Sequence, residues 1–378
     1  MVPSRGSVRA PAALAAGALS LILVLWHLGG GRMGLSRPGF VPTASLRSGI
    51  VLKEGNVLVN SFRTVESDAA FDLEVGWKDF RRASWFVEFS VSKLDLAEAQ
   101  SDFGFTGTER DAALKEPLEA LERKKIAELR AYVSGVVAKS RYRRYIRLVD
   151  RGPLSFSLGL EKPPEDEAEA VRKEFRRIAA AMAKEQTRLD KSQEKDVTRL
   201  YEAFLETRGI RLKDGEMSVA YGLCASRGRV RTRPILESFR AIASDLSLYD
   251  FLALLVAYLQ EVPFVKPPLV EGERTILGYW VPTRVFIENG GDCDSKGVTL
   301  AALWRNFKNS PIVLFKVPDH LFVGLAVPSP ATEGTILFGG LRYTLCEVTG
   351  TELLPPGYIS SYSRMYLESG RYAYERID

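Results

Sequence analysis

Apolar and polar positions along the chain follow different periods in different regions, and these periods predict its elements. Apolar residues alternate with polar ones over 50–62 and 85–92, which is the period of two that a half-buried strand shows. Apolar residues recur at three- to five-residue steps over 110–147, 164–207 and 234–262, which predicts helices there. The pattern therefore predicts strands early in the chain and long helices in its middle.

The N-terminal segment is the most apolar part of the chain. Residues 11–31 contain no Asp, Glu, Lys or Arg, and a helix that spans a membrane needs about 20 mostly apolar residues. A cleaved signal peptide is the rival interpretation, but no clear Ala-x-Ala cleavage site follows the apolar run. We therefore expect a single-pass anchor or uncleaved signal at 1–31, with the soluble part exported from the cell membrane.

The remaining chain is expected to divide into three parts. Residues 32–48 are rich in Gly, Pro, Ser and Arg and are typical of a tether. Residues 49–230 hold the early strands and the long helices, and their role is open. Residues 231–378 form the third part and hold the residues with candidate chemistry.

Composition excludes several classes of function. The net charge is +5 over 378 residues, and we find no basic patch interleaved with aromatic residues, so nucleic acid is not an expected partner. Cys224, Cys293 and Cys346 are too few for a disulfide framework, and no C-x-x-C or H-x-x-x-H spacing suggests zinc. No D-x-D-x-D loop suggests calcium. We expect no metal and no cofactor, and the oligomeric state is not readable.

The stretch from 290 to 297, Gly-Gly-Asp-Cys-Asp-Ser-Lys-Gly, carries the strongest chemical signal. Asp292 is a good N-cap for a helix through 298–307, which would put Cys293 at the first helical position. The helix dipole there favours a thiolate, whereas Asp292 and Asp294 oppose it. Gly291 allows a sharp turn beside the cysteine and leaves space for a substrate backbone. The alternative is that Cys293 is a small apolar residue at a capped helix start.

His320 is the only histidine that follows the N-terminal segment. It begins the strand-like run His-Leu-Phe-Val-Gly-Leu at 320–325, and a cysteine followed by a histidine in a separate element is the arrangement that thiol catalysis needs. Taken alone, His320 would be an ordinary strand-edge histidine. Because it is the only imidazole available to Cys293, we expect it to be the general base.

The remaining roles in such a site have weaker candidates. Glu347 ends another strand-like run, 342–350, and would orient the imidazole, although it could equally be a surface carboxylate. The backbone N–H of Cys293 is the simplest oxyanion donor, and Gln260 and the Trp280 indole are side-chain candidates. Both are more often structural residues.

Taken in order, these motifs resemble a known family. Tyr-x-x-Pro at 279–282, Gly-Gly-Asp-Cys-Asp at 290–294, Asp-His-x-Phe-Val-Gly at 319–324 and Tyr-x-x-x-Glu-x-Thr at 343–349 look like the transglutaminase-like superfamily, in its prokaryotic membrane-anchored branch. The resemblance covers roughly residues 240–358, and it makes residues 231–378 the expected transglutaminase-like catalytic domain.

The resemblance implies a papain-like α+β core, in which a central helix bearing the cysteine packs on an antiparallel sheet. Mapped onto this chain, it makes Cys293 the nucleophile, His320 the base and Glu347 the orienting acid. The superfamily usually has Asp at the third position, and Glu is longer by one methylene group.

Three functions follow as hypotheses. The first is a thiol-dependent peptidase or amidase that hydrolyses a protein or peptide of the cell envelope or the peptide part of the cell wall. The second is a non-catalytic envelope scaffold that uses the same fold to bind a partner. The third is a crosslinking transglutaminase, because an amine can resolve the acyl-enzyme in place of water.

Overall fold

The fold is α+β, as expected. The computed structural model describes residues 61–330, 334–350 and 353–377, and the backbone of three two-residue strands, β1 (Val8–Arg9), β2 (Lys53–Glu54) and β3 (Val57–Leu58). These parts of the chain hold eight helices and several antiparallel sheets. The expected membrane segment, 11–31, and the tether, 32–48, lie outside the described residues. Among the helices that are described, none is both long enough and apolar enough to cross a bilayer.

The described residues divide into two compact units. Unit 1 contains 61–106 and 206–377, and unit 2 contains 107–205. This division differs from the expected boundary between 230 and 231, which falls inside helix α5 (Tyr221–Ile242). The early strands therefore belong with the C-terminal part of the chain.

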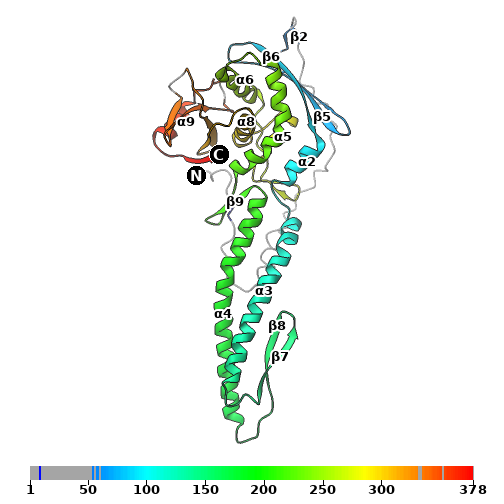
Figure 1. Cartoon of the computed structure of the whole chain (residues 1–378), viewed down its shortest axis with the longest axis vertical. Helices are drawn as coiled ribbons and strands as arrows, with labels where there is room; N and C mark the ends of the chain where they lie inside the picture. Colours follow the sequence, from blue (N-terminus) through cyan, green and yellow to red (C-terminus); the bar gives the residue numbers. More distant parts are fainter. Residues whose placement is uncertain are drawn as a thin grey trace. The chain divides into compact units, whose positions relative to one another are not determined.

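Unit 2 is built from two long helices and a hairpin, drawn in cyan and green in Figure 1: α3 (Gly107–Ala138), β7 (Ile146–Gly152), β8 (Ser155–Leu160) and α4 (Ala168–Thr207). Its core joins all four elements through Leu129, Val133, Val137, Ile146, Phe156, Ile178 and Leu189. The helix predicted over 110–147 ends at Ala138. A turn in which Tyr142 N donates to Ser140 Oγ at 3.2 Å then leads into the hairpin.

Unit 1 begins with an antiparallel meander of β4 (Ser61–Glu66), β5 (Ala70–Lys78) and β6 (Ser84–Ser92), followed by α2 (Lys93–Ser101). Trp77 on β5 is almost fully buried and lies against two rings from the helices, with ring centroids 5.5 Å from Phe239 and 5.4 Å from Tyr258. These aromatic contacts fix the meander on α5 and on α6 (Leu248–Glu261). Aromatic pairs at this spacing add to the burial energy.

The single helix predicted over 234–262 is in fact two helices. Helix α5 begins earlier, at Tyr221, and ends at Ile242, and α6 begins after Ser247. The hydroxyl of Ser247 accepts a hydrogen bond from the backbone N–H of Asp250, which is an N-cap that the apolar period conceals.

The sheet that carries the candidate histidine has five antiparallel strands in the order β15-β16-β14-β13-β17. The strands are β13 (Ile312–Val317), β14 (His320–Leu325), β15 (Thr335–Phe338), β16 (Leu341–Cys346) and β17 (Ala373–Ile377). Helix α8 (Cys293–Phe307) packs on β14, and α9 (Ser361–Glu368) packs on β13. A Cβ on Gly297 of α8 would lie only 2.5 Å from Leu321 Cδ2, so any larger residue there would force this buried side chain to move.

Short elements complete unit 1: β9 (Ile210–Lys213), β10 (Glu216–Val219), β11 (Val270–Glu271), β12 (Arg274–Thr275) and α7 (Pro282–Ile287). The backbone N–H of Gly104 donates to Arg208 O at 3.0 Å. The two points of unit 1 that flank unit 2 in the sequence are therefore neighbours.

Candidate active site

The turn before Cys293 is held from two sides. Cys293 is the first residue of α8, as predicted, and the Asp292 carboxylate accepts hydrogen bonds from Ser295 N at 3.0 Å and from Ser295 Oγ at 2.7 Å. Gly291 pairs with the loop after α6: its N–H donates to Pro263 O at 3.3 Å, and its carbonyl accepts from Val265 N at 3.1 Å. The cysteine is thus fixed at a capped helix start.

Two carboxylates surround the Cys293 thiol, which is 3% exposed. The sulfur donates to Asp294 Oδ1 at 3.4 Å, and the other oxygen of that carboxylate accepts from the Tyr221 hydroxyl. Burial, followed by the charges of Asp294 and Asp292, raises the pKa of Cys293 well above its ordinary value. The thiol is therefore protonated at neutral pH, and a base must remove its proton before the sulfur can act as a nucleophile.

His320 lies at the start of β14, immediately after a two-residue turn. Val317 and His320 are register partners, so Pro318 and Asp319 alone form the loop between β13 and β14. Asp319 has φ of +57°, a left-handed conformation that Asp tolerates better than most residues. The tight turn places the imidazole at the end of the sheet.

Glu347 follows β16 directly and is 3% exposed, so it is not a surface carboxylate. Its Oε2 lies 2.8 Å from His320 Nε2. Its Oε1 accepts from Ser360 N at 3.1 Å, from Ser360 Oγ at 3.0 Å and from Ser363 Oγ at 2.6 Å. Burial alone would raise the pKa of Glu347, but the His320 bond and charge and the serine donors outweigh it and lower that pKa. The carboxylate is ionised and points one oxygen at the ring.

The structure joins two residues of the expected triad, His320 and Glu347, by a hydrogen bond, and it places Cys293 on the helix that packs on the strand of His320. Glu347 engages Nε2 of His320, which leaves Nδ1 as the ring nitrogen for a thiol. The backbone N–H of Leu321, the residue after His320, acts to lower the pKa of the Cys293 thiol, against the larger effects of burial and the two carboxylates. Helix α8, which bears the nucleophile candidate, also packs on β14, which bears the base candidate.

Of the two side-chain oxyanion candidates, only Trp280 has a donor left. The Gln260 amide donates to Glu347 O at 2.7 Å and to Leu354 O at 2.8 Å, so both of its N–H groups are used to hold the backbone around the acid. Trp280 N donates to Ser295 Oγ at 3.0 Å, which ties it to the first turn of α8. Its indole Nε1 is buried and has no hydrogen-bond partner among the described residues.

Sequence reasoning missed several residues that support the site. Tyr221 reaches Asp294 from α5, and Ser360 and Ser363 reach Glu347 from the start of α9. A local signal existed for the serines, because Ser360 is a good N-cap for α9. Tyr221 had none, since it lies far from Asp294 in the sequence.

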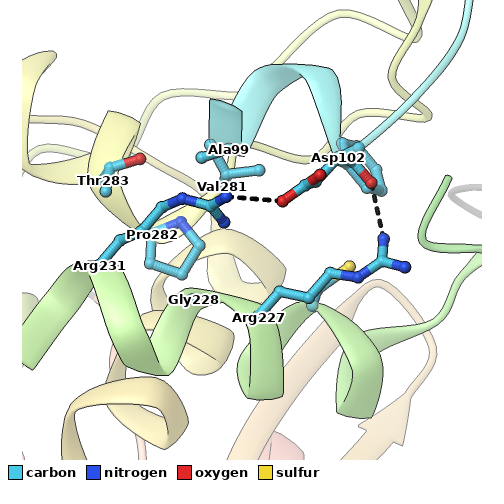
Figure 2. A pocket seen from close by; sticks show the side chains of 10 residues that line it. Ala99, Asp102, Arg227, Gly228, Arg231, Val281, Pro282 and Thr283 are labelled. Carbon is cyan, nitrogen blue, oxygen red and sulfur yellow. Dashed lines mark hydrogen bonds and ion pairs between the residues drawn. The ribbon is translucent and has the colours of Figure 1, made fainter. Parts of the chain in front are cut away.

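A pocket between α2, α5 and the start of α7 does not belong to the triad. It is lined by Asp102, Arg227, Arg231 and seven further residues, none of which is Cys293, His320 or Glu347. Figure 2 shows both arginines turned toward Asp102: Arg231 bonds its carboxylate at 2.7 Å, and Arg227 donates to its backbone carbonyl at 2.8 Å. These polar groups already hold α2 on α5.

Comparison of the chain with protein-family models, with curated proteins and with solved structures returned no match. The assignment of function therefore rests on the geometry of the site and on the motifs in the sequence.

Proposed function

We propose that Cys293, His320 and Glu347 form a thiol acyl-transfer site on a transglutaminase-like core, and that its reaction is hydrolysis of an amide bond in a protein or peptide. The observation that carries the proposal is the hydrogen bond of 2.8 Å between His320 and the buried Glu347. A carboxylate that orients an imidazole beside a thiol stabilises the imidazolium that forms in the reaction. The packing of α8, which begins at Cys293, on β14, which begins at His320, supports the pairing.

The first half of the reaction makes a thioester. The Cys293 proton passes to Nδ1 of His320 as the sulfur attacks the carbonyl carbon of the amide. The negative charge that develops on oxygen is stabilised by the backbone N–H of Cys293 at the start of α8 and by the Trp280 indole. Collapse of this intermediate breaks the carbon–nitrogen bond, and His320 gives its proton to the departing amine.

The second half releases the acyl group. His320 takes a proton from a water molecule as the water oxygen attacks the thioester carbonyl. The carbon–sulfur bond breaks, the product leaves as a carboxylic acid, and His320 returns the proton to Cys293. An amine that attacked in place of water would give a crosslink, which is the transglutaminase reaction.

A second candidate function is a non-catalytic scaffold, which the burial and raised pKa of Cys293 favour. A thiol that is protonated and covered reacts slowly unless a substrate opens the site or the base removes its proton. Unit 2, a separate compact unit, would then bind the partner. The apolar segment 11–31 leads us to propose that either function operates at the cell envelope, from a membrane anchor.

The deciding experiment compares the full-length chain with its Cys293→Ala variant. Each is incubated with an envelope protein extract, and new N-termini and new isopeptide bonds are followed by mass spectrometry. We expect new N-termini that the variant does not produce. Cys224→Ala, which removes another buried cysteine, is the matched control and should behave as wild type. New isopeptide bonds would identify a transferase. Identical products from wild type and Cys293→Ala would refute the proposal that Cys293 is a catalytic nucleophile.

A further inference from the structure

Lys296 is a buried cation one helical turn beyond the nucleophile candidate. Its side chain is 1% exposed, and Nζ donates to the backbone carbonyl of Val262. Burial lowers the pKa of Lys296 to about 8, although the charges of Asp292 and Cys293 act in the opposite direction. A buried ammonium group is costly to keep, so its position beside Cys293 calls for an explanation.

The ammonium group closes a ring of contacts around the turn before Cys293. Val262 is the C-cap of α6, and the loop that follows it pairs with Gly291 through two backbone hydrogen bonds. The aliphatic stem of Lys296 lies along the same turn, because a Cβ on Gly291 would be 3.4 Å from its Cγ. Lys296 thus ties the end of α6 to the helix that presents the cysteine.

Lys296 also supplies a positive charge where the start of α8 is otherwise acidic. Asp292 and Asp294 both raise the pKa of Cys293, so both disfavour its thiolate. An ammonium group close to a thiolate favours it, and this effect is strong in a buried site where water does not screen it.

The elements packed around this turn carry other titratable groups. From α5, the Tyr221 hydroxyl donates to Asp294, and burial raises its pKa so that it is neutral. The end of α6 presents the Val262 carbonyl beside the half-buried Glu261, and β14 begins at His320. Helix α7, which also packs on α8, carries Arg284, which pairs with Glu271 and Glu288.

We propose that Lys296 is a positioning residue, which tethers the loop after α6 to the nucleophile turn and whose charge favours the Cys293 thiolate. The proposal rests on the proposed function, since it assigns Lys296 a part in activating the same thiol. It predicts that the effect of Lys296 on the reactivity of Cys293 depends on pH, because the charge is present below the pKa of Lys296 and is lost above it.

The test measures the rate at which iodoacetamide alkylates Cys293 in the full-length protein, by peptide mass spectrometry. Lys296→Met should slow alkylation about tenfold at about pH 7, where Lys296 is charged, and change it less than about twofold at about pH 9.5, where it is neutral. Lys296→Gln keeps a donor for Val262 O but no charge, and it should behave like Lys296→Met. Thr299→Val, which removes a buried neutral donor one turn further along α8, should match wild type.

Labelling of Cys224 and Cys346, both buried in the wild type, reports any variant that fails to fold. Should both Lys296 variants unfold, the wild-type profile decides: its rate should rise by clearly less than about tenfold per pH unit above about pH 8, as the ammonium charge is lost. Equal slowing of the variants at both pH values, no slowing at all, or a plain tenfold rise in wild type would overturn the proposal. Alkylation measures the reactivity of the thiol directly, so the result does not depend on turnover. The proposed role of Lys296 can therefore fail independently of the proposed enzymatic function.

Discussion

At the scale of single residues, Glu347 has the most complete set of partners in the candidate site. The motif predicted that this carboxylate orients His320, and the structure shows how the carboxylate is held. Ser360 and Ser363 hold Oε1 from the start of α9, which leaves Oε2 directed at His320. Two elements therefore fix the carboxylate: β16, which Glu347 follows, and the start of α9.

Because its pKa is lowered on folding, Glu347 should make stability depend on pH. The contribution is complete above the unfolded value of about 4.5 and is lost as pH falls through the folded value. We expect Glu347→Gln to lower the free energy of unfolding by about 3 kcal/mol at about pH 7, because it leaves buried donors poorly matched. That difference should shrink at about pH 3.

Urea unfolding followed by tryptophan fluorescence measures this difference, since Trp77, Trp85, Trp280 and Trp304 all lie in unit 1. Glu368→Gln, which changes an exposed carboxylate at the end of α9, is the control. A difference between wild type and Glu347→Gln that stayed constant from neutral to acid pH would contradict the linkage.

At the scale of elements, the site depends on how closely α8 approaches β14. Ala at position 297 would press on Leu321, whose neighbour in the chain is His320. We expect Gly297→Ala to destabilise unit 1 by about 1–3 kcal/mol and to lower activity. Gly135→Ala in α3, where a Cβ meets nothing within 4 Å, should instead stabilise unit 2 by about 0.5–1 kcal/mol.

Thermal unfolding checks both changes, with fluorescence reporting on unit 1 and far-ultraviolet circular dichroism on the helices of unit 2. If Gly297→Ala and Gly135→Ala changed thermal stability in the same direction, the packing of α8 on β14 would not explain the effect of Gly297→Ala.

The same scale shows what the sequence could predict and what it could not. The helix start at Cys293 and the strand at His320 were predictable, because a cap, a glycine turn and an apolar run are local signals. The break between α5 and α6 and the hairpin of β7 and β8 were missed. An apolar period continues through a short turn, and Ser247 and Gly152 are weak signals when read alone. Tyr221 and Ser363 reach the site only through tertiary packing, which no local pattern encodes.

At the scale of the whole molecule, unit 2 is an insertion in unit 1. The hydrogen bond between Gly104 and Arg208 shows that the two points of unit 1 that flank unit 2 in the sequence are neighbours. We therefore expect a chain in which a short Gly-Ser linker joins Thr106 to Glu206 to fold. Its Cys293 alkylation rate should stay within about twofold of the full-length value.

Alkylation kinetics and tryptophan fluorescence of the shortened chain check this expectation. Rapid labelling of Cys224 and Cys346 would mean that unit 1 needs unit 2 to fold. Retained alkylation with lost processing of the envelope extract would instead assign substrate delivery to unit 2.

The loop of Pro318 and Asp319, unlike the segment between 106 and 206, should not tolerate a change in length. Side chains alternate between the faces of a strand, so one added residue that shifted the pairing of β14 would turn His320 to the other face. Homologous chains with a working triad should therefore differ freely in length between positions 106 and 206, where a folded unit is already accepted. They should keep two residues between β13 and β14, so the pattern of insertions and deletions among relatives would distinguish working triads from decayed ones.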